Sequence, residues 1–199
     1  MRAGEDALAE RLVALLRGVN VGRANRVAMA DLRALLTDLG YFDVRTLLNS
    51  GNAVFSTIGE AGSAYAAERV REVLAERLAL RVAVVAVSAP ELAVAIAQNP
   101  LADIAGDPAR LLVAFLPDPA DRFLLTAMTE RDWAPEAFAV GERVAYLWCP
   151  EGVAKSPLSH ALGQALGDRV TARNWTTVLK LRALAEDTCS PIPSRVPTP

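Results

Sequence analysis

The chain opens on an apolar run that changes abruptly into a polar loop. Leu12–Leu16 is an uninterrupted apolar stretch, long enough for one buried strand and too short for a helix. From Arg17 the sequence is polar and glycine-rich. Further along, apolar residues spaced at i, i+3, i+4 and i+7 predict a helix over Met29–Leu39, which Gly40 ends. A buried strand that leads into such a loop is a common way for a rigid sheet to present a site.

The following elements alternate in a recognisable order. Val44–Leu48 and Ala53–Ser56 predict two strands joined by a turn over Asn49–Asn52, because glycine and asparagine tolerate the positive φ angles of tight hairpins. A helix over Ser63–Ala79 and a strand over Val82–Val87 follow. The order β-α-β-β-α-β is that of the ferredoxin-like unit.

The second half repeats this order without visible sequence similarity to the first half. We therefore expect an α+β fold, an α/β sandwich of duplicated ferredoxin-like β-α-β-β-α-β units with a C-terminal helix. The expected elements are strands over Leu111–Leu116, Ala137–Val140, Val144–Cys149 and Arg169–Thr171, the last at a sheet edge, and helices over Pro119–Glu130, Ser156–Leu166 and Asn174–Glu186.

Changes in composition mark the expected boundaries. Ser88 and Glu91 form a capping-box pattern that begins a short helix, and a stretch rich in glycine, proline and aspartate then leads to Arg110. The last ten residues hold four prolines and few apolar anchors. The expected divisions are a first subdomain over residues 8–88, a connecting helix and linker over 89–107, a second subdomain with the C-terminal helix over 108–187, and a disordered tail over 188–199.

The composition describes an ordinary core-forming protein of 199 residues, 52% hydrophobic and 22% charged. The net charge of -2 argues against binding to nucleic acid through bulk charge. The acidic N-terminus differs from a signal peptide, and no apolar run reaches the roughly 18 residues of a membrane span, so we expect no membrane association. Cys149 and Cys189 are the only cysteines, which suits a cytoplasmic protein with reduced thiols.

Polar residues gather where the first strand and the hairpin end. The first two strands are expected to run in the same direction, so the loop after the first strand and the hairpin turn share one edge of the sheet. Guanidinium and amide groups around a glycine loop suit an anion. The alternative is a solvated loop whose asparagines stabilise turns. The residues of this first cluster are Arg17, Asn20, Arg23, Asn25, Asn49, Ser50 and Asn52.

A second polar cluster is expected at one edge of the second unit, where its third and fourth strands end. A helix N-terminus beside an arginine can bind an anion. Asn174 as an N-cap explains the same pattern structurally, and both interpretations stay open. The residues of this second cluster are Lys155, Ser156, Arg173, Asn174, Thr176 and Thr177.

Three segments carry a resemblance to a known family: Leu16-Arg-Gly-Val-Asn-Val-Gly22 with Asn25, Ser50-Gly-Asn-Ala-Val-Phe55, and Thr171-Ala-Arg-Asn-Trp-Thr-Thr-Val178. They resemble the three signatures of the domain of unknown function 1697 family and occur in the expected order over nearly the whole chain. Arg23 stands where the family typically has a second glycine, and Asn49 where it often has glutamine. The resemblance implies a duplicated ferredoxin-like fold and implies no activity.

The sequence lacks the motifs of several common chemistries. His160 is the only histidine and lies off the apolar face of its helix, so we interpret it as a surface residue. No phosphate-binding P-loop, nucleophile elbow or zinc-protease motif is present, and we expect neither a metal nor a cofactor. An RNA-recognition module would need aromatic residues on its first and third strands, which offer only Phe55.

Three functions are compatible with these patterns. The leading hypothesis is binding of a small anion or a phosphate-bearing small molecule such as a nucleotide, through the Arg17–Asn25 loop and the Asn49–Asn52 hairpin, with catalysis left open. One alternative is an acylphosphatase-like phosphoryl hydrolase, an analogy of fold in which an arginine of the loop acts with an asparagine of the hairpin. The other is a non-catalytic structural or protein-interaction module that associates through edge strands. The oligomeric state stays open.

Overall fold

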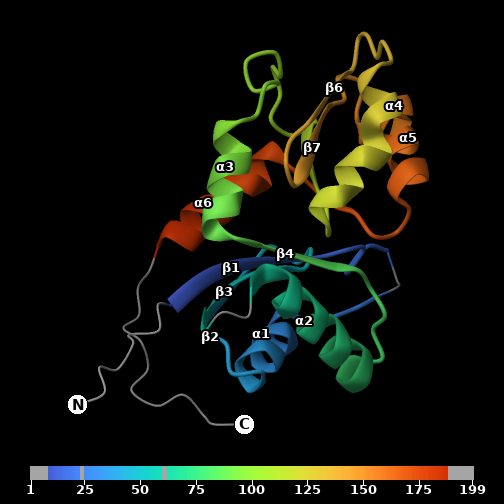
Figure 1. Ribbon diagram of the computed structural model, residues 1–199. Helices are drawn as coiled ribbons and strands as arrows, with labels where there is room; N and C mark the ends of the chain where they lie inside the picture. Colours follow the sequence, from blue (N-terminus) through green and yellow to red (C-terminus); the bar gives the residue numbers. More distant parts are fainter. Residues whose placement is uncertain (1–8, 23–24, 60–61, 188–199) are drawn as a thin grey trace.

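The first half of the chain forms one four-stranded antiparallel sheet with two helices on one face (Figure 1). The computed structural model describes residues 9–22, 25–59 and 62–187. The elements are β1 (Ala9–Leu16), α1 (Met29–Asp38), β2 (Phe42–Leu47), β3 (Asn52–Ile58), α2 (Gly62–Leu78) and β4 (Val84–Ser88). The strand order is β2-β3-β1-β4, so β1 lies inside the sheet.

The second half forms another four-stranded antiparallel sheet, of order β6-β7-β5-β8. Helix α3 (Ala89–Ala97) connects the halves, and α6 (Trp175–Glu186) follows the last strand. The protein is therefore a mixed α+β fold with two antiparallel sheets. The remaining elements are β5 (Leu111–Phe115), the 3-10 helix η1 (Pro119–Leu125), α4 (Thr126–Thr129), β6 (Ala137–Val140), β7 (Val144–Trp148), the 3-10 helix η2 (Val153–Lys155), α5 (Pro157–Leu166) and β8 (Thr171–Asn174).

Two predicted elements of the second half differ in the structure. The helix predicted over Pro119–Glu130 is present, but Pro119–Leu125 is wound as the 3-10 helix η1 and only Thr126–Thr129 form the short α-helix α4. In α4 the hydroxyls of Thr126 and Thr129 donate to the carbonyl oxygens of Phe123 and Thr126, three residues earlier. The last strand begins at Thr171 and continues to Asn174, later than predicted, because these residues pair with β5.

Side chains alternate across the first sheet and fill two cores. Along β1, Leu12, Ala14 and Leu16 contact the core beneath α1 and α2, whereas Val13 and Leu15 face the opposite side. The period of two follows from strand geometry. Because both faces are buried, β1 reads as a continuous apolar run in the sequence.

The opposite face of the first sheet contributes to a middle core that both halves share. This core combines Val54 of β3 with Phe115 of β5, Leu92 of α3 and Leu181 of α6. A third core lies between the second sheet and α4 and α5, on the side away from α3 and α6 (Figure 1). The subdomain division of the sequence stays a prediction, and the connecting segment 89–107 contributes buried residues to the middle core.

A partly buried charge pair also crosses between the halves. Arg143, in the β6–β7 turn, donates to Glu91 Oε1 at 2.6 Å and to the Ser63 hydroxyl at 3.1 Å. The other oxygen of Glu91 accepts from the Ser88 N–H at 2.7 Å, so the predicted capping box of α3 is confirmed. In the described part of the chain, no helix has the length and apolar character needed to cross a membrane.

We expect acid to lower the free energy of unfolding through protonation of Glu91. Burial alone would raise the pKa of Glu91, but the hydrogen bonds from Ser88 and Arg143 outweigh burial and hold the pKa below its usual 4.5. Since the pKa is lower in the folded chain, this stabilisation is present above about pH 4.5 and is lost as the pH falls through the folded value.

Melting temperatures measured across this acid range should fall less steeply for Glu91→Gln than for the wild type. The same substitution at Glu76, exposed on α2, is the matched control and should keep the wild-type slope. Equal slopes for all three proteins would contradict a stabilising role of the Glu91 charge.

Candidate functional site

The loop after β1 is wound by residues in the left-handed region. Gly18, Asn20 and Gly22 have φ between 57° and 61°. The Asn20 amide donates to the carbonyl oxygens of Val27 at 2.8 Å and Asn49 at 2.7 Å, and its oxygen accepts from the Val27 N–H at 3.0 Å. Asn20 therefore closes the loop and ties it to the β2–β3 hairpin.

The hairpin also packs tightly against the end of β1 and the loop at Gly51. Its carbonyl oxygen accepts from the Leu16 N–H at 2.8 Å, and its φ is 70°. A Cβ at this position would overlap the Val19 side chain and lie 2.7 Å from Leu16 Cβ. Both the positive φ and the lack of space explain why glycine stands here.

Arg173, from the second cluster, contacts Asn52 and Ser50 of the first cluster. The side chain extends from β8 toward the first half, with Nε 2.5 Å from Asn52 Oδ1 and Nη2 2.7 Å from the Leu16 carbonyl oxygen. Asn52 is fully buried, at 0% exposure. All five guanidinium N–H groups donate, to Asn52 Oδ1, Leu16 O, Ser50 O, Thr171 Oγ1 and Ala172 O.

These five acceptors are neutral, so the charge of Arg173 has no anionic partner beside it. Among the described residues no carboxylate forms an ion pair with this guanidinium, although other arginines of the chain have such pairs. Burial lowers the pKa of Arg173 to about 10. A desolvated cation surrounded by neutral oxygens produces a positive potential around it.

Arg17 makes the reciprocal contact, from the first half into the second. Its Nη1 donates to the carbonyl oxygens of Gly167 at 3.0 Å and Val170 at 2.6 Å. Its Nη2 lies 3.1 Å from Asp168 Oδ1, but the Asp168 side chain is 100% exposed, so water screens this pair. Arginines of both halves thus donate to backbone carbonyls of the opposite half.

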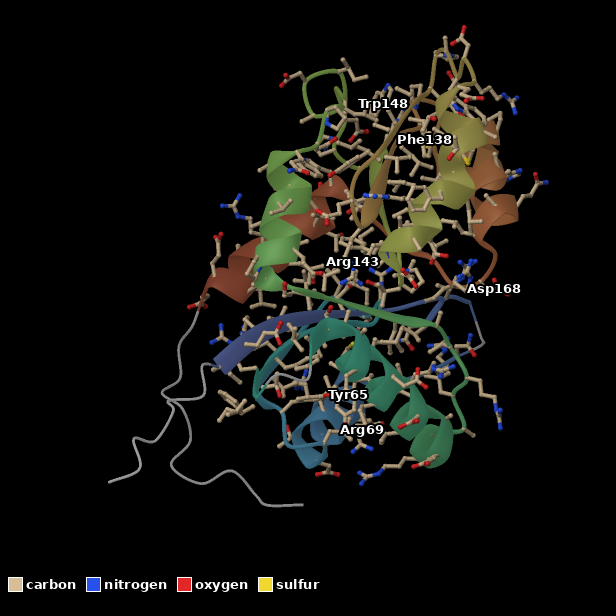
Figure 2. All side chains as sticks on the ribbon, viewed as in Figure 1. Tyr65, Arg69, Phe138, Arg143, Trp148 and Asp168 are labelled. Atoms are coloured by element: carbon tan, nitrogen blue, oxygen red, sulfur yellow. The ribbon has the colours of Figure 1, made fainter. Side chains whose placement is uncertain are left out.

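A hollow of about 360 Å³ lies between the loop after β1 and the segment formed by α5 and β8. Figure 2 shows Asp168, next to this segment, at the seam between the two halves, with Arg143 further along the same seam. The hollow combines arginine side chains with glycine and small residues. The residues that line the hollow include Arg17, Gly18, Val21, Ser159, Gly163 and Arg173.

A larger groove of about 700 Å³ lies on the other side of the Gly167–Val170 turn, between α2 and η1. Its charged residues are of both signs and several are paired, such as Arg169 with Asp121 at 2.8 Å and Arg71 with Glu68. Mixed charge gives it no preference for one kind of ion. Over residues 9–22, 25–59 and 62–187, no group of three or more histidine, cysteine, aspartate or glutamate side chains is arranged to hold a metal ion.

A family model described as "Protein of unknown function (DUF1697)" matches residues 9–146. The chain belongs to the DUF1697 family. The match confirms the resemblance drawn from the sequence signatures. The structure of the conserved bacterial protein SP0830 from Streptococcus pneumoniae has a TM-score of 0.74 and 26% identity to this chain, over 89% of this chain and 99% of that one. No curated protein matches.

The other members of the second cluster do not line the hollow of this DUF1697 protein. Ser156 and Asn174 are N-caps, and each side-chain oxygen accepts from the N–H three residues later at 2.9 Å. Lys155 is exposed and Thr177 is buried. Thr176 lines a separate, largely apolar groove of about 510 Å³ beside α6.

Several residues of the first cluster form hydrogen bonds within the loop and the hairpin themselves. The Asn25 amide lies 3.4 Å from the Gly18 carbonyl oxygen, and Asn49 contributes its carbonyl oxygen to Asn20. Ser50 lines the hollow and bonds Asn52 through its hydroxyl and Arg173 through its carbonyl oxygen. Arg23 lies outside the described residues.

The sequence interpretation missed the wall of the hollow that α5 provides. Ser159 and Gly163 are one helical turn apart and both line the hollow. A pair of small residues at i and i+4 is a signal that could have indicated close approach of another segment. That signal gains meaning only when the partner segment is known.

Gly51→Ala should destabilise the protein by about 2–4 kcal/mol, because it adds left-handed strain to a steric clash with the loop. Gly22→Ala is the matched control: its φ is 61°, but a Cβ there would meet no heavy atom within 4 Å. It should cost about 1 kcal/mol from strain alone. Urea unfolding measures both, and equal losses would contradict the close approach at Gly51.

Arg173→Met should destabilise the protein by about 3 kcal/mol, because it leaves the buried acceptors Asn52 Oδ1 and Leu16 O without donors. Arg182→Met removes an exposed pair with Glu186 on α6 and should cost less than about 0.5 kcal/mol. Urea unfolding compares the two variants. A loss for Arg173→Met as small as that control would mean that the seam does not depend on this guanidinium.

Proposed function

We propose that this protein binds a small molecule through an anionic group, with phosphate as the model anion, in the 360 Å³ hollow between the loop after β1 and α5–β8. The observation that carries the proposal is Arg173, a largely buried guanidinium whose acceptors are all neutral oxygens. Its hydrogen bonds hold it in place and leave its charge uncompensated.

An anion in the hollow would interact favourably with that charge. The interaction is strong because the low dielectric around a buried group reduces screening by water. Arg17 lines the same hollow and adds a second positive charge at its exposed side. Guanidinium groups that are already fixed in place need little further ordering when an anion binds.

The loop backbone supports the same proposal. Within the described part of the chain, the N–H groups of Gly18, Val19 and Val21 donate to no protein acceptor. Left-handed residues alternate with residues of negative φ in this loop. Such alternation turns successive N–H groups toward one side and forms concave anion sites in other proteins.

We also propose that the two halves are duplicated ferredoxin-like units. The sheet orders β2-β3-β1-β4 and β6-β7-β5-β8 correspond strand by strand, and each half follows the order β-α-β-β-α-β. In both halves the loop after the first strand reaches the seam. A cytoplasmic location stays a prediction from the sequence.

The acylphosphatase-like alternative receives less support from the described residues. It needs an arginine and an asparagine that both face the substrate. Asn52 is fully buried, and its amide bonds Leu47, Ser50 and Arg173. No observation specifically favours the interaction-module alternative, so we retain anion binding as the single proposed function.

Ser159→Glu should abolish phosphate binding. Inorganic phosphate should raise the melting temperature of the wild type, by an amount that corresponds to about 2.7 kcal/mol at a concentration of 100 times Kd. A carboxylate at Ser159 would repel the anion, while its place in the first turn of α5 favours a negative charge and preserves folding.

Ser159→Gln is the matched control, because it has nearly the same size without the charge. It should retain most of the response to phosphate. Chloride at equal ionic strength separates specific binding from screening. If phosphate leaves the melting temperature of the wild type at the chloride value, the proposed function is wrong.

A further inference from the structure

We infer that the molecule bound in this hollow is a phosphate monoester with an aromatic organic group, the class to which phenyl phosphate and nucleoside monophosphates belong. The inference rests on the proposed function, since it takes the phosphate position from it. It adds what occupies the remainder of the hollow.

The size of the hollow is the first reason. Its 360 Å³ falls in the range of sites for small organic molecules, about 300–1,000 Å³. A water molecule takes about 30 Å³ of liquid volume, so an inorganic phosphate, with five heavy atoms, would leave most of the hollow to solvent. A site shaped for a free phosphate ion would close around it with polar groups.

The chemistry of the walls is the second reason. Beyond Arg17 and Arg173, the lining includes the apolar residues Leu162 and Val170, which are mostly buried in the third core, and Val21, which is open to solvent. Val21 is 68% exposed, although it is a branched aliphatic residue on a loop. An organic group over the Val21 side chain would remove its apolar surface from water, which favours binding.

The shape of the walls is the third reason. Gly18 on the loop and Gly163 on α5 both line the hollow, and a Cβ at either would meet no heavy atom within 4 Å. The space beside each glycine is therefore open, and the backbone itself forms the wall. Flat backbone surfaces on opposite elements, with aliphatic side chains beside them, suit a planar ring better than a bulky aliphatic group.

The charged part of the site is at the start of the loop. Arg173 binds the Leu16 carbonyl oxygen, whereas Val21 lies five residues further along the chain. A ligand with a dianionic phosphate at one end and a ring at the other matches this succession. An ion with charge on both ends would place one charge over apolar residues, which costs free energy.

Methyl phosphate and phenyl phosphate test the inference, because they carry the same anionic group and differ in the organic group. Calorimetric titration of the wild-type protein should give a Kd for phenyl phosphate about tenfold or more below that for methyl phosphate. Val21→Ser should raise the Kd for phenyl phosphate by about threefold or more and leave the Kd for methyl phosphate unchanged. Val94→Ser, at an exposed valine on α3 outside this hollow, is the matched control and should change neither Kd.

The outcomes separate the two claims. Equal Kd values for the two esters, with both binding, would overturn the aromatic ligand class and keep the proposed function. A preference for phenyl phosphate that Val21→Ser does not reduce would also overturn the inference, because the ring would then bind elsewhere. Binding of neither ester and no response to inorganic phosphate would end the proposed function and the inference together.

Discussion

One partly buried cation, Arg173, connects the two halves through three hydrogen bonds across the seam. Arg173 reaches from the edge strand of the second sheet to the loop and hairpin of the first, and it donates every N–H that it has. The backbone of Arg173 is held in place because it pairs in β8 with Val113 of β5, a residue of the shared middle core. Removing these donors would leave carbonyl and amide oxygens buried without partners. The hydrogen bonds of Arg173 across the seam therefore depend on the apolar packing of the middle core, which holds β8 in place.

The middle core makes the seam rigid enough to form a site. Helix α6 packs on strands of both sheets, and α3 packs against α6. Neither half could bury its inner face alone, since the apolar residues there face the other half. The hollow lies where this packing ends, between a loop that follows β1 and a helix that precedes β8. A binding site at the junction of two packed units is a common arrangement, because rigid elements on both sides position the lining side chains.

The same arginine can hold the structure and attract a ligand because the two roles use different properties. The hydrogen bonds use the directional N–H groups, and neutral oxygens satisfy them. The charge itself is not cancelled by these bonds, and burial lowers the pKa of the group to about 10 without neutralising it at ordinary pH. Arg17 differs, since an exposed carboxylate lies 3.1 Å from it and water screens both groups.

The sequence by itself determined the local elements and the family. The apolar spacing predicted the helix that begins at Met29, and the Ser88–Glu91 pair predicted the capping box, because periodicity and capping involve residues within four positions of each other. An N-cap at Asn174 was one of two interpretations, and the structure shows it. The sequence could not place Arg173 on Asn52, a contact across 121 positions that leaves no local pattern. The wall formed by α5 was likewise decided by tertiary packing. Which polar residues are buried, bonded or open to a ligand depends on what the other half of the chain covers, and only the folded structure determines that.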